Sequence, residues 1–348
     1  MKKLTIGGTV AVATTVLLAS ACTSGGGSRE ADAGDASGPC AGMSVAVAQA
    51  NPGYPRLPVY VARYGDLFAD SGLSVSFSET DAGGDAAAAL VGGSVDITAG
   101  TFGDVLLAQS KGSDMVSFAA TGYEEISNLV IKKSVMDRAG LTEESSPEDK
   151  IKALRGLNIG VTSPGSSTDV LVRGIMKQQG LDPDADANII PVGASAMAAA
   201  FSRNQIDALA LSSPSANAAA NAGDGVVAIN FAAGQYPPLS GPLSMVMNTT
   251  PEIASNKAAE LKCFADGVQR AMKLMREDPA KAKELAWEEF DGVVDRGEFD
   301  ATIDANLAAF AETTEIDEKT VQARKDFVAL TVPAVANLDN TKLFLNTD

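Results

Sequence analysis

The chain has 348 residues, of which 45% are hydrophobic, and it carries a formal net charge of −17 at pH 7. Phosphate contacts need clustered Lys and Arg, and the sequence has no such cluster, so nucleic-acid binding is excluded as a function class. The chain contains no His. This removes the commonest general base and the commonest metal ligand, so we expect no Ser/His/Asp triad, metal site, cofactor or enzymatic activity.

The first 22 residues have the pattern of an export signal. Two Lys precede a mostly apolar run from Leu4 to Leu18, which is too short to span a bilayer, and three small residues follow. Cys22 comes next, as in the bacterial lipobox, although the usual Leu stands one position early, at Leu18. We expect a signal peptide over residues 1–21 and a lipid anchor on Cys22. An ordinary secretory signal with an incidental Cys22 is the alternative.

The segment after Cys22 is predicted to be a disordered tether. Residues 23–39 are mostly Gly, Ser, Asp and Ala, and they cannot bury enough apolar surface to offset the entropy cost of ordering. We expect residues 22–42 to form a flexible linker that reaches about 20–25 Å on average.

Two further cysteines, Cys40 and Cys263, remain in the exported chain. An even number of thiols in an oxidising compartment makes a disulfide between them possible. Two unpaired buried thiols are the alternative.

The chain beyond Cys40 is long enough for two lobes, and its pattern of elements occurs twice. The first series is expected as strand 44–49, helix 57–64, strand 74–78, helix 85–91 and a strand from residue 95. The second is expected as strand 158–161, helix 168–179, strand 189–192, helix 195–202 and a strand from residue 206. Matching positions such as Asp96 and Asp207 are about 110 residues apart. The alternation predicts two α/β units with mainly parallel sheets covered on both faces.

Two crossings are expected between these units. A strand at 128–131 follows Thr121-Gly122-Tyr123, and a Pro/Gly-rich stretch at 235–242 precedes a strand at 243–247. We therefore assign 43–123 and 242–348, with C-terminal helices, to lobe 1 and 124–241 to lobe 2. Two crossings form a hinge.

Four ordered stretches carry a family resemblance. They are residues 58–62 with Gly65 and Phe68, residues 89–96, residues 154–161 with 165–167, and residues 199–207 with Ser213-Pro214. They resemble extracytoplasmic solute-binding proteins of ABC importers, in the branch for alkanesulfonates, taurine, nitrate and thiamine-precursor pyrimidines. The resemblance implies a type II periplasmic-binding-protein fold. It also implies a monomeric receptor that delivers a small solute to an ABC permease and its ATPase, attached to the outer face of the cell membrane through Cys22.

Ligands of open α/β sheets bind beyond the carboxyl ends of the strands, which directs attention to the loops there. The candidate ligand-binding residues are Gln49, Asn51, Tyr54, Gly84, Asp85, Thr98, Gly100, Thr101, Tyr123, Ser163, Gly165, Ser166, Ser167, Thr168, Gly193, Ser212 and Ser213.

The sharpest candidate is the loop from Ser163 to Thr168. Its Gly and hydroxyl residues lead into a helix whose N-terminus favours negative charge, so an anionic group is the expected ligand. The alternative is that Ser167 or Thr168 only caps its own helix. Ser212 and Ser213 stand where sulfonate-binding relatives carry Trp and Asp, which indicates a roomier or differently polar pocket.

Three other candidates have structural alternatives. Gln49 lies where sulfonate-binding relatives place a polar contact, but a Gln at a strand end usually faces solvent. Tyr123 is expected either to stack on the ligand or to pack in the hinge. Asp96 and Asp207 resemble a paired-carboxylate site, but their repeated position favours a structural role at the turn.

Two other functions remain open from the sequence. The same fold serves cytosolic enzymes of thiamine-pyrimidine and menaquinone synthesis, although this chain lacks the His and Cys-rich motif of the pyrimidine synthase. A sensory or adhesive lipoprotein without a transporter is the other possibility.

Overall fold

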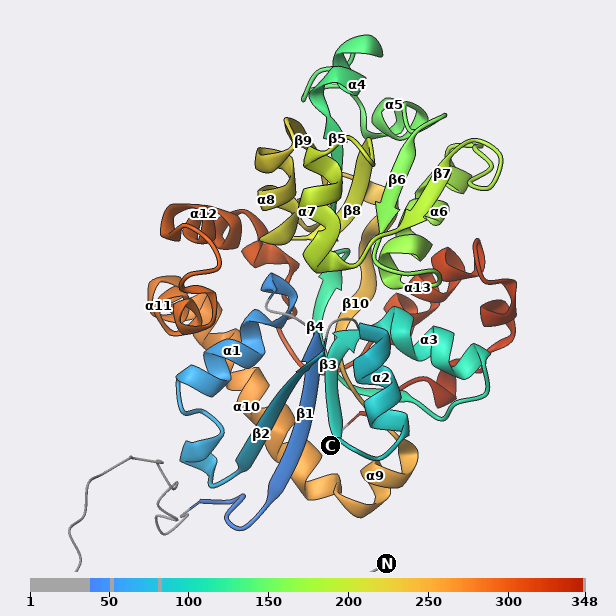
Figure 1. Ribbon diagram of the computed structural model, residues 1–348. Coiled ribbons are helices and arrows are strands. Elements are labelled where there is room, and N and C mark those ends of the chain that lie inside the picture. Colours follow the sequence, from blue (N-terminus) through green and yellow to red (C-terminus); the bar gives the residue numbers. More distant parts are fainter. Residues whose placement is uncertain (1–37, 51–52, 81–82, 347–348) are drawn as a thin grey trace, which may run out of the picture. The chain divides into compact units, whose positions relative to one another are not determined.

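Two five-stranded sheets with the same internal order form the framework of the chain (Figure 1). The computed structural model describes residues 38–346 except 51, 52, 81 and 82. The predicted signal peptide, Cys22, most of the predicted tether and Asn51 therefore lie outside the described residues. The first sheet, in spatial order, consists of β2 (Ser74–Thr80), β1 (Ser44–Ala50), β3 (Ile97–Thr101), β10 (Ser240–Thr249) and β4 (Val116–Glu124). The second consists of β7 (Asn188–Pro191), β6 (Asn158–Val161), β8 (Ala208–Ser212), β5 (Ser127–Lys132) and β9 (Gly225–Asn230).

One strand in each sheet runs against the others, and it is the strand that follows a crossing. β10 pairs antiparallel with β3 and β4, and β5 pairs antiparallel with β8 and β9. The remaining pairs are parallel. The chain leaves the first sheet after Glu124, and it returns between Asn230 and Ser240. Two α/β lobes joined by two crossings, as predicted, are confirmed.

Helices cover both faces of each sheet. Those that accompany the first sheet, here lobe 1, are α1 (Leu57–Tyr64), α2 (Gly83–Val91), α3 (Phe102–Ser110), α9 (Pro251–Asn256), α10 (Ala258–Glu277), α11 (Pro279–Phe290), α12 (Arg296–Asn306) and α13 (Glu318–Ala329). Those that accompany the second sheet, here lobe 2, are α4 (Lys133–Arg138), α5 (Pro147–Lys152), α6 (Ser167–Gln178), α7 (Ala194–Ser202) and α8 (Ser215–Ala222). No helix in the described part of the chain combines the length and hydropathy needed to cross a bilayer.

The apolar cores follow these layers. One core lies between the first sheet and helices α1, α10 and α11. The core on the opposite face of that sheet, under α2 and α3, continues into lobe 2 beneath α6. Helix α13 packs against β10, α3 and α6 and therefore contacts both lobes beside the hinge (Figure 1).

The same hydrogen-bonded arrangement occurs once within each lobe. Asp96 Oδ2 accepts a 2.9 Å bond from the Ala46 N–H, and Asp207 Oδ2 accepts a 3.0 Å bond from the Asn158 N–H. In each case the Asp N–H donates back to the carbonyl of the same partner. Both Asp residues thus tie the turn before one strand to the neighbouring strand, as expected. The structural counterpart of Asn158 is Ala46, two residues later than the sequence pattern indicated.

Three helices begin one or two residues before their predicted starts, namely α2 at Gly83, α6 at Ser167 and α7 at Ala194, and helix α3 was not predicted. Helix α6 begins at Ser167 with Ser166 as its N-cap, one residue before the predicted start. Helix α3 follows β3 without a loop, because Thr101 and Asp104 form a capping box. That T-x-x-D spacing is a helix-start signal that the sequence analysis did not use.

A disulfide joins Cys40 to Cys263 and fastens the start of the described chain to α10. The two residues are 223 positions apart, so the bond closes a loop that contains most of the fold. Both cysteines are buried.

Removing this bond by the double substitution Cys40→Ser/Cys263→Ser should lower the free energy of unfolding by about 2–5 kcal/mol, because the unfolded chain regains the entropy of a long loop. Urea unfolding of the variant and of the wild type, with and without reductant, measures the effect. Reductant should lower the wild type to the level of the variant and leave the variant unchanged. Equal stability of the oxidised wild type and the variant would contradict the prediction.

Candidate functional site

A cavity of about 340 Å³ lies between the lobes and is lined by residues from both sheets. Lobe 1 contributes Pro55, Arg56, Gly83, Gly84, Ala87, Gly100, Thr101, Asp104, Leu107, Ala108 and Lys111. Lobe 2 and the first crossing contribute Ile126, Ser127, Thr162, Ser163, Pro164, Gly165, Ser166, Ser167, Thr168, Ala194, Leu211, Ser212 and Ser215. A molecule bound in this cavity would contact both lobes, so its contacts would change if the lobes moved relative to each other.

Many of the predicted ligand-binding residues line this cavity. They are Gly84, Gly100, Thr101, Ser163, Gly165, Ser166, Ser167, Thr168 and Ser212. These come from the ends of β3, β6 and β8 and from the start of α2, which meet at one edge of each sheet as parallel strands require.

Other predicted residues lie elsewhere. Gln49 is fully buried at the end of β1 and is not solvent-facing, and its amide atoms have no hydrogen-bond partner in the described chain. Thr98 is also buried, whereas Asp85 is exposed on α2. Gly193 is the N-cap of α7, next to a lining residue. Tyr123 lies in the hinge, where its hydroxyl donates to the Glu315 carbonyl over 2.9 Å.

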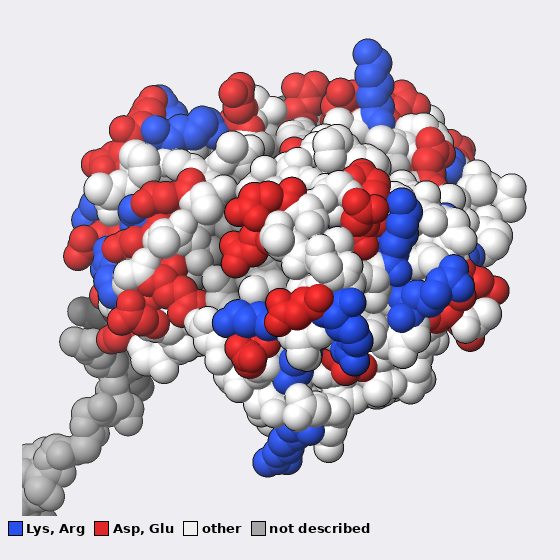
Figure 2. Space-filling model, turned by 90° about the horizontal axis from the view of Figure 1, so that it is seen from above, with Lys and Arg blue, Asp and Glu red and all other residues white. Residues whose placement is uncertain are grey.

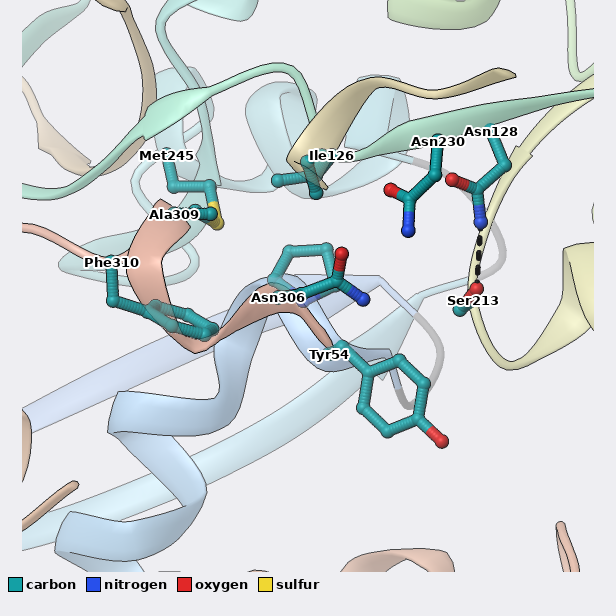
Figure 3. Close-up of a pocket in the computed structure, with 11 residues that line it drawn as sticks. Tyr54, Ile126, Asn128, Ser213, Asn230, Met245, Asn306, Ala309 and Phe310 are labelled. Atoms are coloured by element: carbon teal, nitrogen blue, oxygen red, sulfur yellow. Dashed lines mark hydrogen bonds between the residues drawn. The ribbon is translucent and has the colours of Figure 1, made fainter. Parts of the chain in front are cut away.

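Tyr54 and Ser213 line a second, smaller pocket (Figure 3). It has room for about one water molecule, about 20 Å³, between the lobes and the segment after α12. Tyr54 stacks on Phe290 with ring centroids 5.1 Å apart, and its side chain points away from the amides of Asn128 and Asn306. The Ser213 hydroxyl accepts a 2.8 Å bond from the Asn128 amide. This pocket is too small for an organic solute.

The charged groups of the large cavity were missed by the sequence analysis. Arg56, Asp104 and Lys111 all come from lobe 1. Asp104 had a signal in the capping-box spacing, and Arg56 follows the Tyr54-Pro55 turn. Lys111, the C-cap of α3, could be placed only once that helix was known.

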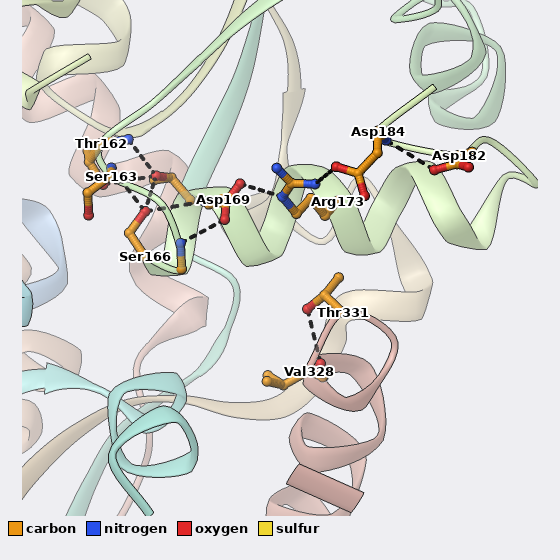
Figure 4. A network of polar contacts seen from close by, with 11 residues as sticks. Thr162, Ser163, Ser166, Asp169, Arg173, Asp182, Asp184, Val328 and Thr331 are labelled. Atoms are coloured by element: carbon orange, nitrogen blue, oxygen red, sulfur yellow. Dashed lines mark hydrogen bonds and ion pairs between the residues drawn. The ribbon is translucent and has the colours of Figure 1, made fainter. Parts of the chain in front are cut away.

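The loop from Ser163 to Thr168 has most of its donors engaged inside the chain (Figure 4). The Ser166 hydroxyl accepts from the Asp169 N–H over 3.3 Å, which makes Ser166, rather than Ser167 or Thr168, the helix cap. The Thr168 hydroxyl accepts from the Thr162 N–H over 3.0 Å. Asp169 Oδ2 accepts a 2.7 Å bond from the Gly165 N–H.

Asp169 places a carboxylate at the N-terminus of α6. It is buried, and its other oxygen binds Arg173, which also pairs with Asp184. The positive end of the α6 dipole is therefore already partly compensated. The hydroxyls of Ser163 and Ser167 make no hydrogen bond within the described chain, and both residues border the cavity. They are therefore the hydroxyls of this loop that remain available to a solute.

A buried ion pair holds the two crossings together. Arg324 on α13 and Glu125 are 5% and 6% exposed, and Arg324 Nη1 donates to Glu125 Oε2 over 2.8 Å. Arg324 Nε donates to the carbonyl of Leu243 on the returning strand over 2.8 Å. Glu125 Oε1 accepts from the N–H groups of Ile126 and Ser127. One side chain thus binds the first crossing and the strand that follows the second crossing.

Outside the cavity, charges of both signs are interspersed. On the face in Figure 2, Lys and Arg lie among Asp and Glu without a continuous basic area. This face offers no surface for a polyanion.

Comparison with known proteins identifies a family model and similar solved structures. The model, described as the NMT1-like family, matches residues 50–287. A protein from Bordetella bronchiseptica RB50 is 25% identical, with a TM-score of 0.73, over 87% of this chain and 95% of its own. No curated protein matches the chain.

Two further solved structures have the same fold. One is the alkanesulfonate-binding protein SsuA from Xanthomonas axonopodis pv. citri bound to MOPS, which is 15% identical with a TM-score of 0.69 over 89% of this chain and 100% of its own. The other is the periplasmic nitrate-binding protein NrtA from Synechocystis PCC 6803, also 15% identical, with a TM-score of 0.65 over 87% and 86% of the two chains. Both are described as binding proteins rather than enzymes.

We expect the protein to lose much of its stability when one partner of the Glu125–Arg324 pair is replaced. Arg324→Met leaves the Glu125 carboxylate buried without its counterion and should lower the free energy of unfolding by about 3–5 kcal/mol. Urea unfolding measures this loss. Adding Glu125→Gln to Arg324→Met should restore part of it, because no unpaired charge remains. A single variant as stable as the wild type would show that the pair is unimportant.

Glu124, next to this pair, predicts a pH effect. It ends β4 opposite Ser240, and burial raises the pKa of its carboxyl above the usual value, although hydrogen bonds from Ser240 and Gly241 oppose that shift. Since the folded pKa is the higher one, ionisation costs stability as pH rises through the folded pKa. Glu124→Gln should therefore raise the melting temperature at pH 7. Thermal melts should show this gain vanish below about pH 4; a gain that persists there would contradict the cause.

Proposed function

The chain belongs to the NMT1-like family, and from that premise we propose that it is the solute-binding component of an ABC importer. The observation that carries the proposal is the polar cavity between two lobes that the chain crosses twice. A solute that contacts both lobes stabilises one relative placement of them over others, which is the requirement for ligand-driven closure.

The hinge supports this role. Arg324 binds Glu125 in the first connection and Leu243 on the strand after the second, whereas the cavity walls are separate loops. The lobes also meet at Gly174 of α6, where an added Cβ would lie 2.4 Å from the Phe327 ring of α13. The lobes are closely packed here and are separated by the polar cavity elsewhere. This arrangement is compatible with a small rotation of one lobe about the hinge.

We infer that the protein acts outside the cytoplasm, held to the membrane by a lipid on Cys22, and hands its solute to a permease as a monomer. The nitrate-binding protein NrtA is described as periplasmic, which supports the compartment. The anchor rests on the N-terminal sequence pattern alone.

The solute is proposed to place an anionic or hydroxyl-bearing end against lobe 2. Ser163 and Ser167 offer hydroxyl donors there, and the cavity is lined by further Ser and Thr. Because Asp169 already occupies the helix N-terminus, the hydroxyls and not the dipole supply most of this recognition.

Ser167→Ala tests this contact, and Ser166→Ala is its matched control. We expect Ser167→Ala to weaken binding by about tenfold or more, since a hydrogen bond to a charged group contributes about 1.5–3 kcal/mol, and to leave the melting temperature unchanged. Ser166→Ala should instead cost about 1 kcal/mol of stability through loss of the helix cap.

Thermal-shift screening of the purified protein against sulfonates, nitrate, carboxylates and MOPS identifies binders, and calorimetry gives their affinities. X-ray scattering should show compaction with a binder. Unchanged affinity in Ser167→Ala would sink the lobe 2 contact. Binding without compaction would argue against closure.

A further inference from the structure

One carboxylate, that of Asp104, borders the cavity from lobe 1. It belongs to the first turn of α3, directly beyond β3. A Cβ built on Gly100 would lie 3.0 Å from Asp104 Oδ2, and one built on Gly83 would lie 3.8 Å from Oδ1. Both glycines also line the cavity, and neither has a positive φ. Their backbone conformation does not demand glycine, so what they provide is space beside the carboxylate.

The two oxygens of Asp104 differ in their partners. Oδ2 accepts bonds from the Thr101 N–H over 2.9 Å and from the Thr101 hydroxyl over 3.0 Å. Oδ1 makes no hydrogen bond within the described residues. The capping interaction therefore fixes the carboxylate in place and leaves one oxygen for another donor.

This environment disfavours a bare carboxylate. Burial raises the pKa of Asp104 above its usual value, and the hydrogen bonds from Thr101 and the charge of Arg56 only oppose that effect. Arg56 itself donates from Nε to the Ala99 carbonyl over 3.2 Å. A half-buried carboxylate of this kind is stabilised most by a donor that carries positive charge.

The uncharged residues that line the cavity indicate which kind of solute fits between its polar ends. Among the described residues that line the cavity, none is aromatic, and the apolar ones are Pro, Ala, Leu and Ile. The lining therefore has no aromatic side chain on which a planar ring of the solute could stack. The wall suits a small aliphatic molecule with polar ends.

We propose that Asp104 is a specificity-determining residue, which binds a protonated nitrogen of an aliphatic solute while the opposite end of that solute contacts the Ser163–Thr168 loop. This rests on the proposed function, because it assumes that the solute spans the cavity. An anion without nitrogen would bring no donor to Asp104 Oδ1 and would meet that carboxylate with like charge.

Matched pairs of small molecules test the proposal. The pairs are 3-aminopropanesulfonate and propanesulfonate, 4-aminobutanoate and butanoate, and 4-aminobutanol and butanol. Calorimetry on the full purified protein should show that at least one amino compound binds, and that it binds at least tenfold more tightly than its partner without nitrogen.

Asp104→Asn should abolish the preference for the amino compound over its partner without nitrogen. The substitution keeps an oxygen to accept from Thr101, so α3 stays capped, but it removes the charge. We expect the amino compound to lose about tenfold or more in affinity and its partner to lose none. Asp207→Asn is the matched control, because Asp207 also accepts a backbone N–H at a strand start but lies outside the cavity lining. It should retain the preference.

The outcomes separate this proposal from the proposed function. If the compounds without nitrogen bind as well as the amino compounds, or if Asp104→Asn keeps the preference, the role of Asp104 is wrong and solute binding stands. If none of the six compounds binds, the role of Asp104 is wrong as stated. If, in addition, no compound of the wider screen binds, the proposed function fails with it.

Discussion

The buried pair of Glu125 and Arg324 is the interaction on which the two-lobed arrangement depends. Arg324 on α13 binds Glu125 at the first crossing and the Leu243 carbonyl of β10, the strand that follows the second crossing. Buried ion pairs contribute little net stability compared with apolar packing, but they penalise any arrangement that separates the charges. The cost of separating Glu125 from Arg324 keeps the lobes joined at this point. The cavity walls away from the pair are not held by it.

Much of the fold could be predicted because it follows from local patterns. Alternating strands and helices, the turn residues between them and the repeated Asp96 and Asp207 were enough to predict two similar lobes. Helix α3 was not predicted, because it follows β3 with no turn residue between them. Its Thr101-to-Asp104 capping box was the only signal.

The location of the candidate site could be predicted from the fold, but the hydrogen bonds between its side chains could not. The loop after β6 lines the cavity, as its position at a strand end indicated. That Asp169 would occupy the helix N-terminus, and that Ser166 rather than Ser167 would cap it, depended on hydrogen bonds between near neighbours. The capping-box spacing marks Asp104 as a residue at a helix start, but the tertiary packing that brings Asp104 and Arg56 to the cavity has no signal in the sequence.

The bond between Cys40 and Cys263 has a mechanical consequence. Cys40 precedes β1, which is held in the sheet by its neighbours β2 and β3. Tension applied to the chain ahead of Cys40 would otherwise peel β1 away one hydrogen bond at a time. The covalent link passes that load to α10, a 20-residue helix buried along one side in lobe 1. Under such a load, lobe 1 would be the fixed end of the molecule.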